Sequence, residues 1–181
     1  CTLGGMIGNN SCGVHSMLSD FYGPGPTTAH NVDRLDVVTY RGLRLSLGPT
    51  SDEEYRRIVA EGGPRGDLYR QLKTFQGRYA DAIRADFPAI PRRVSGYNLP
   101  ALLPENGFHV ARAVVGSEST LAMVLQAEVH LVRHFPHRAI VVLGYRDIYG
   151  AADAVPAILE HRPIGLEVVD EMLIRSGIHS G

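Results

Sequence analysis

The first sixteen residues, CTLGGMIGNNSCGVHS, bring glycines and small polar side chains together with only scattered apolar residues. Such a stretch suits a tight loop that leads into a short helical turn, and its glycines leave backbone amides uncovered. It contains neither GxGxxG nor GxxxxGK[ST], so it is neither a dinucleotide fingerprint nor a P-loop. Two interpretations stay open: a structural turn, or a loop whose amides bind phosphate and ring-carbonyl groups of a cofactor.

Cys12 and His15 lie three residues apart in this stretch, a spacing that allows an imidazole to activate a thiol. No third residue can be nominated to orient the imidazole, so we do not favour a nucleophile and base pair here. A small cysteine packed near a cofactor is the plainer interpretation of Cys12. His15 is expected to donate a hydrogen bond to a phosphate or carbonyl, or to be a satisfied core histidine. The sequence identifies no catalytic base.

His130, His134 and His137 form a second cluster of chemically capable side chains. On a helix the first two would share a face and could hold a metal. The alternating pattern of residues 128–131 favours a strand instead, and Pro136 interrupts any regular element beyond it. We therefore expect exposed histidines at a strand end and no metal site.

Arg92 and Arg93 precede Tyr97 and Asn98 in the segment PRRVSGYNLP. A guanidinium can hold a phosphate or carboxylate through two parallel hydrogen bonds. A solvated surface pair of arginines is an equally good interpretation. Tyr97 and Asn98 rank above the arginines as residues that line a site.

The composition excludes several classes of protein. The chain has 181 residues, of which 44% are hydrophobic and 20% charged, with a net charge of -1. This balance disfavours a dedicated nucleic-acid binder, and two cysteines do not require a disulfide framework. The strongly apolar runs are shorter than the ~20 residues that cross a bilayer, so we expect no transmembrane segment. These are values of a soluble globular protein with one domain or slightly more.

Periodicity predicts elements of both kinds. Leu35–Tyr40 and Arg44–Leu47 suit a β-hairpin that turns at Gly42, and residues 120–132 alternate as a strand. Ser51 and Glu54 form a capping box for a short helix, and a longer helix runs from Asp67 to Phe87. Farther along, the sequence predicts a buried strand at 139–144, a helix at 151–160, and a strand or helix start at 165–169. The chain opens inside a motif and closes without a capping element, so we expect a fragment of a longer protein.

Three motifs resemble one known family. Residues 1–16 resemble the second FAD-contact segment of the FAD-linked oxidases, whose flavin domain is of the PCMH, or vanillyl-alcohol-oxidase-like, type. VSGYNLPALLP (94–104) and FHVARAVVGSESTLAMVLQAEVHLV (108–132) resemble that family's GYNL and GSEGTLG segments in the same order. Three motifs in order are far more specific than one. One departure is Ser119, which stands where the family has glycine.

The resemblance implies an α+β fold in two parts. Residues 1–137 would form the second half of the PCMH-type FAD-binding domain, an antiparallel sheet flanked by helices. Residues 138–181 would begin a ferredoxin-like substrate, or cap, domain that is truncated here.

The resemblance also implies which residues lie at the flavin. Thr2, Gly4 and Gly5 would approach it through their backbone, and residues 118–124 would form a second wall to which Val124 contributes main-chain groups. The full set of implied cofactor-binding residues is Thr2, Gly4, Gly5, Asn9, Asn10, Ser11, Cys12, His15, Tyr97, Asn98, Glu118, Ser119, Thr120, Leu121 and Val124.

The function implied is an FAD-dependent dehydrogenase of a 2-hydroxy acid such as D-lactate, glycolate or D-2-hydroxyglutarate, with a separate electron acceptor. The long bacterial members also carry an iron–sulfur cluster in another domain. A cytoplasmic location is expected, with peripheral membrane association as an alternative. We expect the 181 residues alone to be inactive, since the flavin-diphosphate loop and the catalytic groups lie elsewhere in this family. The rival hypothesis is a non-catalytic interaction or metal-binding module.

Overall fold

The computed structural model describes residues 1–19, 23–132 and 134–179. The chain divides into two compact units, one formed by residues 1–12 and 24–131 and the other by residues 13–23 and 132–181. The elements of the first unit are α1 (Leu3–Asn9), α3 (Thr28–Asn31), β1 (Val32–Thr39), β2 (Arg44–Leu47), α4 (Asp52–Glu61), α5 (Gly63–Asp86), η2 (Leu99–Leu102), η3 (Pro104–Asn106), α6 (Val110–Val114) and β3 (Ala122–Val129). The second unit contains the 3₁₀ helix η1 (Val14–Leu18) and the helices α7 (Ile148–Glu160) and α8 (Glu171–His179). The predicted boundary between residues 137 and 138 stays a prediction.

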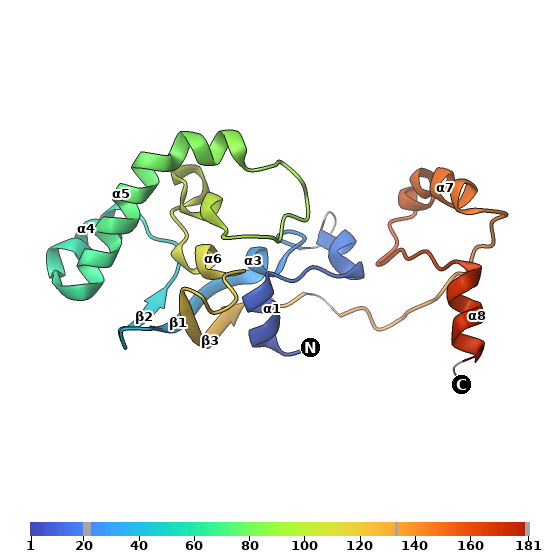
Figure 1. Cartoon of the computed structure of the whole chain (residues 1–181), viewed down its shortest axis with the longest axis horizontal. Coiled ribbons are helices and arrows are strands. Elements are labelled where there is room, and N and C mark those ends of the chain that lie inside the picture. Colours follow the sequence, from blue (N-terminus) through green and yellow to red (C-terminus); the bar gives the residue numbers. More distant parts are fainter. Residues whose placement is uncertain (20–22, 133, 180–181) are drawn as a thin grey trace. The chain divides into compact units, whose positions relative to one another are not determined.

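A three-stranded antiparallel sheet organises the first unit, with the strands in the order β2-β1-β3 (Figure 1). Leu35 of β1 pairs with Leu47 on one side and with Ala127 on the other. The hairpin turns at Gly42, whose φ of 77° is a conformation that glycine adopts without strain. The predicted hairpin is therefore confirmed, and so is the strand that comes after the GSEST motif (residues 116–120). The α+β class with an antiparallel sheet is confirmed as well.

Two helices come after the hairpin. Ser51 caps α4, because its hydroxyl accepts a hydrogen bond from the amide of Glu54 at 3.1 Å. The next helix, α5, begins at Gly63 rather than at the predicted Asp67, since proline is well tolerated in a first helical turn. A methyl group on Gly66 would lie 3.0 Å from the carbonyl oxygen of Ile58, so the two helices cross closely there.

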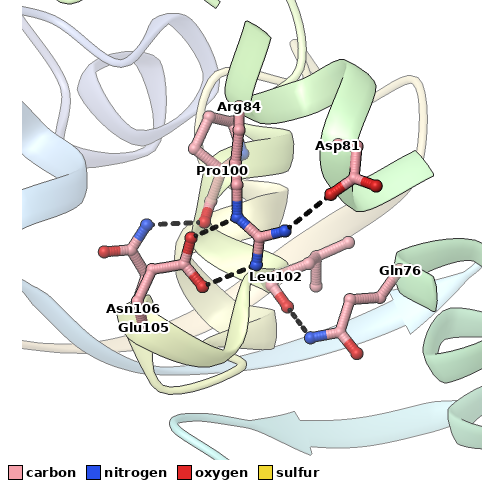
Figure 2. Close-up of polar contacts among 7 residues, drawn as sticks. All are labelled: Gln76, Asp81, Arg84, Pro100, Leu102, Glu105 and Asn106. Atoms are coloured by element: carbon pink, nitrogen blue, oxygen red, sulfur yellow. Dashed lines mark hydrogen bonds and ion pairs between the residues drawn. The ribbon is translucent and has the colours of Figure 1, made fainter.

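Short helical segments lie between the sheet and α5. Helix α6 contacts β1 on one side and η2 on the other, and η2 contacts α5 (Figure 1). The buried side chain of Gln76 donates to the carbonyl of Leu102 at 2.8 Å. Arg84 near the end of α5 makes a bidentate ion pair with Glu105 at 2.9 and 3.1 Å (Figure 2). These contacts fasten the segment that carries Tyr97 and Asn98 to a long helix. The largest fully buried side chains are Tyr69, Ile7, Leu35, Ile58, Val32, Val37 and Val115.

The prediction for residues 1–16 is corrected at its start. Residues 3–9 form a helix rather than a loop, because the Thr2 hydroxyl caps it by accepting from the amide of Gly5 at 3.1 Å. Asn10 ends the helix in the left-handed conformation, with a φ of 55°. The high glycine content conceals this helix in the sequence, since glycine disfavours helices by about 1 kcal/mol per residue.

The predicted strand at 139–144 is wrong. Those residues form no helix or strand, and Ile140 and Val142 are 92% and 89% exposed. The possible strand at 165–169 is absent as well, whereas the predicted helix at 151–160 lies within α7. A strand needs a neighbour to satisfy its amides and carbonyls, and no strand occurs among the described residues of this unit.

Candidate functional site

The three motif segments meet at Gly116. A methyl group on this glycine would lie 3.1 Å from the Cβ of Asn10, 3.6 Å from the carbonyl oxygen of Gly96 and 3.8 Å from that of Val94. Gly116 has a φ of 87°, which favours glycine independently of the space around it. The chain therefore needs glycine here both for its backbone conformation and for close packing of the three segments.

Backbone hydrogen bonds join α1 to the turn that contains Gly116. The amide of Gly116 donates to the carbonyl of Ile7, and the amide of Glu118 donates to the carbonyl of Gly8, both at 2.9 Å. These carbonyls belong to the last turn of α1, where that of Ile7 also accepts a longer hydrogen bond, at 3.4 Å, from the amide of Asn10. The GSEST turn thus supplies the amides that this helix end needs.

The GYNL segment reaches the same turn through side chains. The hydroxyl of Tyr97 lies 2.9 Å from that of Thr120, which also donates to the carbonyl of Ser117 at 2.6 Å. Asn98 is occupied differently: its Oδ1 accepts from Arg93 at 2.8 Å, and its amide nitrogen donates to the carbonyl of Arg112 at 3.0 Å. Tyr97 is therefore a surface residue of the site, whereas Asn98 supports it from within.

The tip of the GSEST turn is conformationally unusual. Glu118 and Ser119 have φ values of 49° and 62°, in the left-handed region that side chains with a Cβ adopt at a cost. The hydroxyl of Tyr40 donates to the carbonyl of Ser119 and helps to hold this conformation. Ser119 therefore has a backbone conformation that favours glycine, the residue expected at this position from the resemblance.

Several of the expected site residues also hold the first unit together. Asn10 is 4% exposed, and its Oδ1 accepts from the amide of Ala29 at 2.9 Å. The carbonyl of Ser11 accepts from the amide and from the hydroxyl of Thr28, each at 2.9 Å. The side chain of Val124 is partly buried and packs against the core from β3. Asn10 and Ser11 thereby anchor α1 against α3.

The remaining expected residues of the first unit are exposed. Tyr97 and Leu121 are each 44% exposed, and the space beside Gly4 is open. The exposed members of the expected set in this unit are Thr2, Gly4, Gly5, Asn9, Cys12, Tyr97, Glu118, Ser119, Thr120 and Leu121. An aromatic face, an aliphatic side chain, hydroxyls and glycines whose backbone is uncovered are the groups that contact a flavin. The residues present fit such a cofactor.

His15 belongs to the second unit, where it lies exposed in η1 and its ring is close to Gly165. His130 comes directly after β3, and its Nε2 lies 2.9 Å from a carboxylate oxygen of Asp33. Among residues 1–19, 23–132 and 134–179, no three His, Cys, Asp or Glu side chains gather as they would around a metal ion.

Tyr40, Gly116 and Arg112 also support this site, although no sequence pattern singled them out as site residues. The Arg112 guanidinium donates to the carbonyls of Val32 and His30 at 3.1 and 3.0 Å, which ties α6 to the start of β1. Of these three residues, only Gly116 could have been identified from the sequence, because it is the glycine of the GSEST motif.

Two partly or wholly buried histidines lie beside Arg112. Burial, and after it the positive charge of Arg112, lower the pKa of His109 to about 4. Burial and Arg112 also lower the pKa of His30. Both imidazoles are therefore neutral near pH 7, and the Nδ1 of His109 caps α6 by accepting from the amide of Arg112 at 3.3 Å.

Relatives of known name match nearly the whole chain. It is 29% identical over 174 residues to a D-2-hydroxyglutarate dehydrogenase of Pseudomonas putida, a match that covers 96% of this chain. It is 26% identical over 175 residues to the enzymes of that name from Pantoea ananatis and Escherichia coli. No family model and no solved structure matches the chain. The resemblance to the 2-hydroxy-acid dehydrogenases is confirmed by these relatives.

The chain spans only a small part of those proteins. It corresponds to 17% of the Pseudomonas putida enzyme and to 16% of the one from Pantoea ananatis. None of the helices among the described residues is long and apolar enough to cross a membrane.

Proposed function

We propose that this chain is part of an FAD-dependent dehydrogenase that oxidises a 2-hydroxy acid, with D-2-hydroxyglutarate as the first candidate. The observation that carries the proposal is the meeting of α1, the GYNL segment and the GSEST turn at Gly116. These segments lie far apart in the sequence. Each resembles a flavin-contact segment, and their convergence supports one shared binding surface. The names of the relatives support the substrate class.

The exposed residues of this surface would hold the cofactor. FAD, when bound, supplies the chemistry, because its ring accepts a hydride from the alpha carbon of the hydroxy acid. Gly4 would present its backbone, while Tyr97, Thr120 and Leu121 would orient the cofactor and exclude water from it. Asn10, Asn98 and Gly116 would keep these groups in place without touching the cofactor.

Residues 138–181 would belong to the substrate, or cap, domain. The base that removes the hydroxyl proton, and most of the groups that bind the carboxylate, would come from parts of the protein outside these 181 residues. An iron–sulfur cluster in a further domain would pass the electrons to an acceptor. A cytoplasmic location, with or without peripheral attachment to a membrane, suits such an enzyme.

Spectroscopy of the full-length protein tests the proposal. The purified protein should carry a yellow chromophore with flavin absorbance, and anaerobic addition of D-2-hydroxyglutarate should bleach it. D-lactate and glycolate, added in the same way, distinguish the three candidate substrates. A full-length protein that binds no flavin would refute the proposal and favour the non-catalytic module. Residues 1–181 alone should bind FAD weakly or not at all.

A further inference from the structure

Arg93 has an unusual environment for a charged side chain. Its guanidinium lies 4.9 Å from the centre of the Phe87 ring, and one nitrogen donates to Oδ1 of Asn98 at 2.8 Å. The residue is half-buried, and burial lowers its pKa. Its neighbour Arg92 is exposed. The structure thus separates two arginines that the sequence could not distinguish.

No carboxylate of the described residues forms an ion pair with Arg93. The next cation is close by, because Asn98 bridges Arg93 to the backbone of Arg112. The charge of Arg112 is met only by the carbonyls of Val32 and His30 in the part of the chain that the structure describes. Arg112 lies beside His30, because its guanidinium donates to the carbonyl of His30, and the positive charges of Arg112 and Arg93 lower the pKa of the His30 imidazole.

A partly buried cation without a counter-charge costs free energy, because desolvation destabilises its charged form. A bound anion would offset this cost. Stacking on Phe87 and the hydrogen bond to Asn98 fix the plane of the Arg93 guanidinium and leave further N–H groups without a partner in the described residues. A preorganised guanidinium fork matches the two oxygens of a phosphate or carboxylate group. Lysine, a point charge, would not provide this match.

We infer that Arg93, with Arg112 and His30 beside it, forms a binding site for an oxyanion group, either a phosphate or a carboxylate. Asn98 and Phe87 are the residues that position Arg93. The inference goes beyond the proposed function, because it concerns anion binding by this chain and needs no flavin chemistry. A nucleotide phosphate and a carboxylic-acid substrate are the two sources of such a group.

Side-chain NMR of the ¹⁵N-arginine-labelled 181-residue chain tests the site directly. Inorganic pyrophosphate and D-2-hydroxyglutarate are titrated separately, and the Nε signal of Arg93 should shift saturably with at least one of them. The probe that binds more tightly identifies the source of the anion. If neither probe moves this signal, the inference is wrong, whatever becomes of the flavin proposal.

Two matched variants exclude a general effect of charge. Arg93→Gln should weaken binding by about tenfold or more, and Arg92→Gln by less than about twofold, although both remove one positive charge. Arg93→Lys keeps the charge but loses the fork, so it should bind between the wild type and Arg93→Gln. Equal weakening by Arg92→Gln and Arg93→Gln would overturn the inference, because it would indicate non-specific attraction. The backbone NMR spectrum of each variant reports whether it still folds.

Discussion

The hydroxyl of Tyr97 lies 2.9 Å from the hydroxyl of Thr120, and this contact joins the GYNL segment to the GSEST turn. The same Thr120 hydroxyl donates to the carbonyl of Ser117 at 2.6 Å, so Tyr97 is linked through Thr120 to Ser117. Ser117 is buried, whereas Tyr97 is 44% exposed. The contact therefore holds an exposed aromatic ring against a turn that is anchored by the buried Ser117.

Removing the Tyr97 hydroxyl should loosen this aromatic ring. We expect Tyr97→Phe to lower the free energy of unfolding by about 0.5 to 1 kcal/mol, since a single exposed hydrogen bond contributes little. In the full-length protein it should also weaken FAD binding. Tyr79→Phe is the matched control, because Tyr79 is 39% exposed on α5 and should lose nothing. Urea denaturation and flavin titration measure the two effects, and equal losses in both variants would contradict the assigned role of Tyr97.

Ser119→Gly should stabilise the chain. A φ of 62° costs a residue with a Cβ on the order of 1 kcal/mol, and glycine removes that cost. FAD affinity of the full-length variant should be unchanged or higher, because the substitution also relieves crowding. Ser46→Gly, in the exposed face of β2, should destabilise instead, since glycine weakens a strand. Substantially weaker FAD binding by Ser119→Gly would mean that the serine hydroxyl is a ligand.

Gly116→Ala should have the opposite effect. Its φ of 87° and the Cβ of Asn10, only 3.1 Å from the added methyl group, together predict a loss of about 2 kcal/mol or more. Gly77→Ala is the control, because Gly77 lies inside α5 with nothing within 4 Å of an added methyl group. That substitution should stabilise the chain by roughly 0.5 to 1 kcal/mol. Thermal unfolding measures both variants, and a Gly116→Ala chain as stable as the wild type would contradict tight packing at Gly116.

Local patterns predicted the elements whose stability is local. The hairpin around Gly42 and the helix capped by Ser51 depend on residues close in sequence, so turn and capping signals were sufficient. The strand expected at 139–144 depends on a partner elsewhere, and periodicity carries no information about whether that partner exists. The helix at 3–9 was missed because its caps outweigh its glycines.

The sequence predicted which segments form the site, but not which of their side chains face a ligand and which bond to other parts of the protein. The motifs named the residues, yet nothing in the sequence indicates that Asn10 would bond to Ala29 or that Asn98 would hold Arg93. These partners lie across tertiary contacts, which a single sequence does not specify. The sequence placed His15 with the site residues, and the structure assigns it to the other unit.

The buried imidazole of His109 should make stability depend on pH. Its pKa of about 4 in the folded chain compares with 6.5 for an ordinary histidine. Between these values the unfolded chain binds a proton that the folded chain does not, so stability falls as pH falls. The full difference corresponds to about 3 kcal/mol, lost between pH 6.5 and pH 4 and constant below that. Arg112 and Arg34 oppose protonation of this imidazole, and Asp33 favours it.

His109→Asn should remove most of this dependence, because asparagine can still cap α6 by accepting from the amide of Arg112 but has no proton to bind near pH 5. At pH 7 the variant should be less stable than the wild type, since it lacks the packing of the ring. As the pH approaches 4 the two should converge. His30, whose pKa is also lowered, leaves a smaller slope of the same sign in both proteins. Urea unfolding at half-unit steps between about pH 4 and pH 7.5 measures the two curves, and parallel curves would show that His109 does not titrate in this range.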